Sequence, residues 1–195
     1  MYVDIYNTNK KYNIIYADPP WNYKNSPSKK GTSRGFAKNH YDLMTINDLQ
    51  KLNINKISAG NSVLFMWATF PMIGEALETI KNWGFNYRTC AFVWIKKNKK
   101  VNTNFWGCGY YTRSNAEICL LATKGKILER KSHSVHQIIE SAVEKHSQKP
   151  LVVRDKIIEL FGDIPRIELF ARQKTEGWDC WGNEVGGEKD EASND

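Results

Sequence analysis

The tetrapeptide Asp18-Pro19-Pro20-Trp21 contains the residue types that point most directly to chemistry. It follows the mostly apolar residues 14–17, which are typical of a buried strand. Proline fixes φ and has no N–H, so the pair ends the strand abruptly and restricts the residue before it. The resulting stiff turn presents one carboxylate and several backbone carbonyls. Because the prolines have no N–H, they cannot donate hydrogen bonds that would compete for these carbonyls. Such a turn suits a planar group that carries N–H donors, although an ordinary strand-ending turn has the same sequence.

Two long stretches combine basic residues with an absence of acids. Residues 22–41 hold Lys24, Lys29, Lys30, Arg34 and Lys38. Residues 96–115 hold five more basic residues, including Lys99, Lys100 and Arg113, and the aromatic residues Phe105, Trp106, Tyr110 and Tyr111. Loops of this length in a compact domain are usually functional or disordered. Basic groups bind phosphates and rings stack on bases, so the pattern favours a nucleic-acid interface over solvated flaps.

The overall composition bounds the class of protein. The chain has 195 residues, of which 41% are hydrophobic and 25% charged, as expected for one soluble globular core. Its formal charge is +7, but residues 186–195 carry four acids and one lysine, so the remainder carries +10. We expect residues 1–185 to form a single domain and residues 186–195 to be an acidic disordered tail. The high positive charge of residues 1–185 favours a polyanionic partner.

Cysteine, histidine and apolar patterns exclude several other classes. The four cysteines form no CxxC pair and the four histidines show no zinc spacing, which predicts no metal site and reduced thiols. His133-x-x-His136 is better explained as part of a solvated basic loop. No leader and no apolar stretch of membrane-spanning length is present, so we expect no membrane partner and a cytoplasmic location.

The elements that must position these residues follow from short apolar runs alternating with helical patterns. Strands are predicted at 12–18, 62–69, 87–96, 116–123, 136–141 and 166–172. Helices are predicted at 45–52, with a capping box at Thr45-x-x-Asp48, at 70–84 and at 149–162. This alternation predicts an α/β fold with a mostly parallel, doubly wound sheet. Such sheets bind ligands outside the carboxyl ends of their strands.

Several motifs occur together in a recognisable order. After Asp-Pro-Pro-Trp come Tyr41-x-x-Met44, LFMWAT, WGF, FVWIK, NAEICLLATKG, SQKP, RIELFAR and WGNE. Over residues 4–184 the chain resembles the MT-A70 family of adenine-N6 methyltransferases. The resemblance implies a Rossmann-like class I methyltransferase fold with a circularly permuted, beta-class motif order.

The resemblance implies transfer of the methyl group of S-adenosylmethionine to the N6 amine of adenine. Asp18 and the Pro19 carbonyl would each accept one amine N–H, which frees the nitrogen lone pair for direct in-line displacement. Pro20 and Trp21 complete the catalytic turn, and Trp21 would stack on the base or fix its pocket. A duplex substrate would require the adenine to be flipped out of the stack.

Cofactor-binding residues are also implied by position. Asp4 and Ile5 match the family's acidic-apolar pair at the cofactor adenine, although their distance in sequence from Asp18 is shorter here. Lys149 would meet the methionine carboxylate near a helix N-terminus, and its alternative role is a solvated first-turn lysine. Asp18 itself borders the cofactor.

The last predicted strand adds the remaining cofactor residues. Glu168 lies in the family's cofactor strand, and Arg172 matches a ribose-contacting arginine; alternatively, Glu168 forms a local ion pair with Arg166 or Arg172. Asn183 and Glu184 match the pair beside the adenosine, where glutamine is more usual than Glu184.

The substrate side is assigned to the turn and the two basic stretches. Tyr41 resembles a substrate-side aromatic residue, with packing beneath the first loop as its alternative, and Asn115 and Glu117 flank the family's substrate loop. The predicted substrate-binding residues are Trp21, Tyr41, Lys29, Lys30, Arg34, Lys38, Lys99, Lys100, Trp106, Tyr110 and Arg113.

Three alternatives accompany this interpretation. We favour DNA over RNA because the chain is minimal, prokaryotic or viral in style, and shows no RNA-binding module. A catalytically silent nucleic-acid-binding scaffold is the alternative of a different class. Methylation of cytosine N4 or a protein glutamine is less favoured, because tryptophan occupies the fourth motif position. Members of the family pair as homodimers or heterodimers, and the sequence leaves both open, as it does the target sequence.

Overall fold

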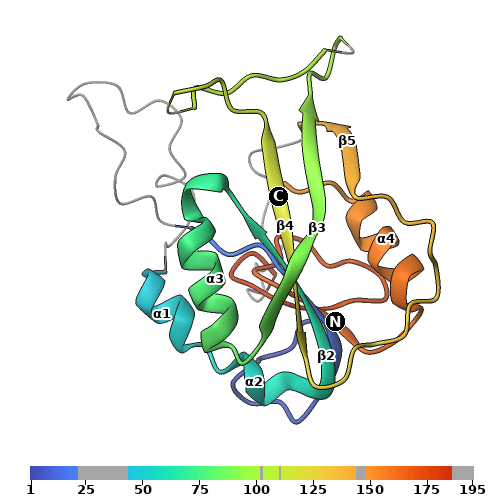
Figure 1. The fold of residues 1–195 in the computed structure, drawn as a ribbon. Coiled ribbons are helices and arrows are strands. Elements are labelled where there is room, and N and C mark those ends of the chain that lie inside the picture. Colours follow the sequence, from blue (N-terminus) through green and yellow to red (C-terminus); the bar gives the residue numbers. More distant parts are fainter. Residues whose placement is uncertain (22–43, 102, 110, 144–147, 186–195) are drawn as a thin grey trace, which may run out of the picture.

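The computed structural model describes residues 1–21, 44–101, 103–109, 111–143 and 148–185 (Figure 1). These residues form a seven-stranded sheet in the order β5-β3-β4-β2-β1-β6-β7. The strands are β1 (Tyr12–Ala17), β2 (Ser58–Ala68), β3 (Asn86–Lys97), β4 (Ala116–Lys124), β5 (Ile138–Ala142), β6 (Arg166–Leu169) and β7 (Asp179–Trp181). The helices are α1 (Ile46–Lys51), α2 (Ile54–Ile57), the 3₁₀ turn η2 (Phe70–Met72), α3 (Ile73–Asn82) and α4 (Val152–Phe161).

The sheet is mostly parallel, as predicted. Among the described strands only β4 runs against its neighbours, pairing antiparallel with β2 and β3. β1, which leads into Asp-Pro-Pro-Trp, lies beside β6, the predicted cofactor strand, although the two are far apart in sequence. This arrangement confirms the mixed α/β prediction and is consistent with a Rossmann-like methyltransferase fold.

Helices cover both faces of the sheet (Figure 1). Successive strand side chains point to opposite faces, so alternate residues of β1 and β2 enter two separate cores. Ile15 and Leu64 pack in the core that α1 and α3 cover, whereas Ile14 and Phe65 pack in the core beneath α4. Burial on both faces explains why these two strands are almost continuously apolar.

Local signals account for the predicted helix ends. The Thr45 hydroxyl accepts a hydrogen bond from the Asp48 N–H at 3.1 Å and donates one to the Asp48 carboxylate at 2.6 Å, which confirms the N-terminal cap of α1. The helix predicted at 70–84 is η2 followed by α3, and Gly84 follows its end at φ 83°. Gly162, at φ 80°, follows α4.

The structure differs from the predicted elements at several places, one of which is the short helix α2, which was not predicted. β2 begins at Ser58, four residues earlier than expected, and β6 ends at Leu169, three residues earlier. β6 stops because Phe170 adopts a φ of 60°, a left-handed conformation that turns the chain out of the sheet. The three-residue β7 was not predicted, since a strand that short has no measurable periodicity.

Candidate active site

Strand direction collects the predicted site residues at one edge of the sheet. Asp18 directly follows β1, Arg172 lies shortly after β6, and Asn183 follows β7, all at the carboxyl ends of parallel strands. Because β4 runs in the opposite direction, its first residues lie at this same edge, next to the end of β3. This is the edge at which open α/β sheets bind ligands.

Asp18 and Lys149 are in direct contact at this edge. The Lys149 ammonium lies 2.8 Å from Oδ1 and 3.0 Å from Oδ2 of Asp18, and the two side chains are only 10% and 15% exposed. Lys149 precedes α4, and its nitrogen lies 5.7 Å from the centre of the Trp67 ring. Two residues predicted independently from the sequence are therefore brought together from opposite parts of the chain.

Glu117 and Lys96 extend this contact into a chain of alternating charges. Lys149 lies 3.2 Å from Oε2 of Glu117, and Lys96 lies 2.5 Å from its Oε1. Burial alone would raise the pKa of Glu117, but Lys149 and Lys96 together hold that pKa below its ordinary value. Burial likewise opposes the charge of Lys149, yet Asp18 and Glu117 raise its pKa. The ion pairs thus keep both buried groups charged.

Trp21 forms the wall behind the proline turn. Its backbone N–H donates to the Pro19 carbonyl at 2.8 Å, and its indole N–H donates to the Trp67 carbonyl at 2.9 Å. The side chain is buried in the core beneath α3. These contacts fix the orientation of the turn, and of the two roles considered for Trp21 they favour shaping the pocket over open stacking.

Glu168 is held by an arginine that the sequence did not single out. Arg154 of α4 donates from Nε to Oε2 at 2.8 Å and from Nη2 to Oε1 at 2.5 Å. Arg166, considered as a local partner of Glu168, instead pairs with Asp163 at 2.5 Å. The pairing of a helix residue with a strand residue depends on tertiary packing, so no local spacing could indicate it.

Asp4 and Ile5 reach the same edge beside β7. Tyr2 forms a parallel bridge with Cys180, so the first residues run alongside β7 in the same direction. The Asp4 carboxylate accepts hydrogen bonds from the Tyr6 N–H at 2.9 Å and the Asn7 amide at 2.6 Å. Ile5 is buried in the core, whereas Asn183 and Glu184 are exposed.

Gly182 allows two loops of this edge to cross closely. A Cβ at this position would lie 2.4 Å from the Ala171 carbonyl oxygen and 2.6 Å from the Ala171 nitrogen. Those distances exclude any side chain, so the segments after β6 and β7 can approach each other only with glycine here. The WGNE motif therefore has a packing requirement as well as its predicted ligand role.

The second basic stretch projects from the carboxyl edge between β3 and β4 (Figure 1). Lys99, Lys100 and Arg113 are exposed, and Trp106 is 55% exposed, so these cations and this ring face solvent. Asn115 closes the base of the stretch by hydrogen bonding to the backbone of Lys96. The other predicted substrate residues, Lys29, Lys30, Arg34, Lys38, Tyr41 and Tyr110, lie outside the described residues.

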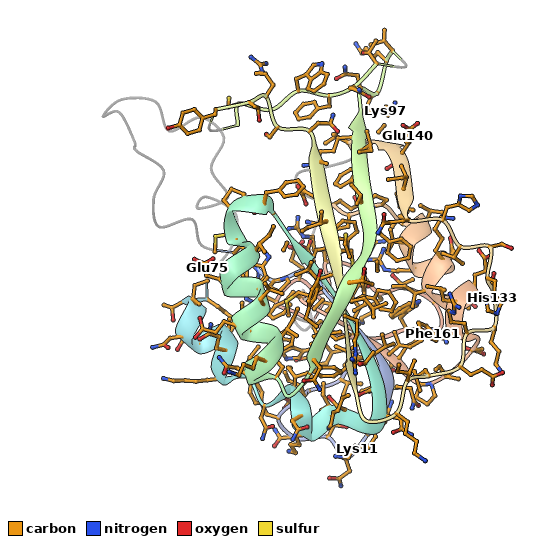
Figure 2. All side chains as sticks on the ribbon, viewed as in Figure 1. Lys11, Glu75, Lys97, His133, Glu140 and Phe161 are labelled. Carbon is orange, nitrogen blue, oxygen red and sulfur yellow. The ribbon has the colours of Figure 1, made fainter. Side chains whose placement is uncertain are left out.

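A cavity of about 580 Å³ lies at the opposite edge of the sheet and contains none of the predicted site residues. Its lining includes Lys11, Arg166 and Asp179, at the amino ends of β1, β6 and β7. Figure 2 labels Lys11 at the end of the molecule far from Lys97 and Glu140. The cluster around Asp18 is therefore separate from this cavity.

In the described part of the chain, no group of three or more His, Cys, Asp or Glu side chains is arranged to hold a metal ion. No helix in the same residues has the length and apolar character needed to cross a membrane.

The mostly parallel, seven-stranded sheet is consistent with the Rossmann-like fold of methyltransferases. The sequence model of the MT-A70 family matches residues 12–184, so the chain belongs to that family. It is 37% identical to the type II methyltransferase M.MunI of a Mycoplasma species over 190 residues, which cover 90% of this chain and 78% of that protein.

Two more distant relatives are similar over most of this chain. Identity is 24% over 186 residues with the N6-methyladenosine RNA methyltransferase MTA1 of Pyricularia oryzae, and 25% over 197 residues with the human N(6)-adenine-specific methyltransferase METTL4. The matched regions cover 89% and 92% of this chain, but only 47% and 38% of those proteins.

Proposed function

We propose that this protein transfers the methyl group of S-adenosylmethionine to the N6 amine of adenine in nucleic acid, with DNA as the favoured substrate. The observation that carries the proposal is Asp18, a nearly buried carboxylate on a double-proline turn at the ligand-binding edge, paired with Lys149 at 2.8 Å. Membership of the MT-A70 family and two relatives named for adenine-N6 methylation support the choice of acceptor.

Asp18 and Pro19 perform the part of the reaction that concerns the substrate amine. The amine is a weak nucleophile because its lone pair is delocalised into the purine ring. Asp18 accepts one N–H, and the Pro19 carbonyl accepts the other through the lone pair that the Trp21 N–H leaves available. The nitrogen is thereby drawn towards tetrahedral geometry, and catalysis consists mainly of positioning and electrostatics.

The residues around Asp18 fit the proposed cofactor chemically. S-adenosylmethionine, when bound, supplies a sulfonium-linked methyl group that a nucleophile can displace directly. The Lys149 ammonium suits the carboxylate of its methionine part. Asp4, Asn183 and Glu184 would offer polar groups to its adenosine part, and Arg172 would contact the ribose. Ile5 would act through packing and Glu168 through β6, the strand that leads to Arg172, because both are buried.

The substrate side consists of the solvent-facing cations and rings between β3 and β4. Lys99, Lys100 and Arg113 would contact phosphates, and Trp106 would stack on a base. DNA is favoured over RNA because the relative with 37% identity is a type II methyltransferase, whereas the RNA methyltransferase is 24% identical.

Mass spectrometry of digested nucleic acid tests this function. The purified protein is incubated with isotopically labelled S-adenosylmethionine and with DNA or RNA of matched sequence. We expect labelled N6-methyladenine, with more in DNA than in RNA. Labelled methylcytosine, or no labelled base in either polymer, would contradict the proposal. A silent scaffold with a collapsed pocket would in addition show no heat when the cofactor is titrated in.

A further inference from the structure

Lys96 belongs to the buried charge cluster, although no sequence motif assigned it a role. We propose that Lys96 is a positioning residue for methyl transfer: by holding one oxygen of Glu117, it leaves Lys149 available to Asp18 and to the cofactor carboxylate. This inference rests on the proposed function. Lys96 touches Glu117, at 2.5 Å, and acts on the reaction only through that contact.

The register of β3 and β4 explains why Lys96 reaches Glu117. Trp94 lies directly opposite Glu117 in the antiparallel pair, and Lys96 is two residues further along the same face of β3. Diagonal neighbours of this kind are within reach of a long side chain. The Lys96 ammonium also lies 5.0 Å from the centre of the Trp94 ring, a cation–π distance.

The backbone of Lys96 is fixed from two sides. The Asn115 side chain accepts from the Lys96 N–H at 3.1 Å and donates to the Lys96 carbonyl at 2.9 Å. The same carbonyl accepts the Phe105 N–H at 2.8 Å. These bonds continue the pairing of the two strands beyond Ile95 and Ala116, the last residues of the ladder. These hydrogen bonds therefore fix the backbone position from which the Lys96 side chain extends.

The balance of charges in the cluster explains why Lys96 affects Lys149. Lys96, Glu117, Lys149 and Asp18 are two cations alternating with two carboxylates. Without Lys96, Lys149 would be the counter-ion of both carboxylates, and both oxygens of Glu117 would compete with Asp18 for it. Lys96 and Glu117 are only 19% and 13% exposed, so solvent screens this competition weakly.

Lys97 provides a matched control for a Lys96→Met substitution. It is the next residue of the same strand, points to the other face, and has a similarly buried side chain at 20% exposure. It pairs with Glu140 of β5 at 3.3 Å, and Figure 2 shows the two side by side. Lys97→Met therefore removes the same charge from the same strand without touching the cluster.

Calorimetric titration of S-adenosylmethionine into the full-length protein makes the comparison. We expect Lys96→Met to weaken cofactor binding roughly tenfold or more, since Glu117 then has only Lys149 as its counter-ion and competes with the cofactor carboxylate for it. Lys97→Met should stay within about twofold of the wild type, as for other peripheral ion pairs. Equal affinities of Lys96→Met and wild type would overturn the inference. Absence of binding to the wild type would instead overturn the proposed function.

A Glu117→Gln background separates positioning from general packing, and it remains informative if Lys96→Met alone does not fold. Once Glu117 is neutral, it cannot draw Lys149 away from Asp18. We therefore expect Lys96→Met to change cofactor affinity by less than about twofold in this background. A loss as large as the one seen in the wild-type background would show that Lys96 acts through its bulk, and would overturn the inference.

Discussion

The ammonium of Lys149 lies within hydrogen-bonding distance of both carboxylate oxygens of Asp18, 2.8 Å from one and 3.0 Å from the other. The two residues are 131 positions apart in sequence, one after β1 and the other before α4. Their contact joins the end of a central strand to the start of the helix that covers one face. It also supplies a counter-charge to the nearly buried Asp18 carboxylate, because an unpaired charge at this depth would be energetically costly.

Exposed cations of the β3–β4 connection should determine how nucleic-acid binding responds to salt. Each phosphate contact contributes about 0.9 to the slope of log affinity against log salt concentration. Lys100→Gln should therefore weaken DNA binding and reduce that slope by about one. Fluorescence anisotropy at several salt concentrations measures both quantities. Lys126→Gln is the control, because Lys126 is also exposed but lies after β4, at the opposite edge. Equal slopes for Lys100→Gln and the wild type would mean that Lys100 does not contact a phosphate.

Trp106→Ala should reduce substrate binding without reducing stability. The side chain is 55% exposed, so little core packing is lost, whereas loss of a stacked base costs about 1–3 kcal/mol. We expect KM for DNA to rise and the melting temperature to stay within a degree or so of the wild type, since exposed substitutions change stability little. An unchanged KM would mean that Trp106 does not stack on a base of the substrate.

Glu168→Gln should destabilise the fold strongly. Removing one partner of a buried, doubly hydrogen-bonded ion pair typically costs about 3–5 kcal/mol. The substitution removes such a pair, the one between Glu168 and Arg154. Urea unfolding measures the difference, and Glu129→Gln is the matched control because its ion pair with Lys131 is exposed. The control should change the free energy of unfolding by less than about 1 kcal/mol. Similar small effects of both substitutions would show that the buried pair contributes little.

Acid should destabilise the protein partly through Glu117. Its pKa in the folded protein lies below the ordinary value of 4.5, because Lys149 and Lys96 outweigh the effect of burial. The folded state therefore holds the proton less tightly than the unfolded state, and this contribution to stability is lost as pH falls below about 4.5. Urea unfolding between pH 7 and pH 3 should show a shallower loss for Glu117→Gln than for the wild type. Parallel curves would mean that the ion pairs do not shift this group.

The sequence predicted the central strands and most of the helices because burial on both faces and local capping leave clear patterns. It predicted Asp18 and Lys149 individually, but not that they touch. Glu117 and Arg154 take part through contacts that depend on how β4 reverses and on which face of α4 meets the sheet. Such contacts join residues far apart in sequence, and neither periodicity nor motif spacing reports them.

Substitution of Asp18 by alanine tests the central claim most directly. Single-turnover methyl transfer to DNA and calorimetric cofactor binding are measured on the same preparations, with Asp179→Ala as a control carboxylate at the opposite edge. Because the proposed mechanism has Asp18 act on the substrate amine, its loss should slow methyl transfer at least about a hundredfold while cofactor binding remains measurable. Asp179→Ala should retain transfer. Methyl transfer by Asp18→Ala at the wild-type rate would contradict the role assigned to this carboxylate.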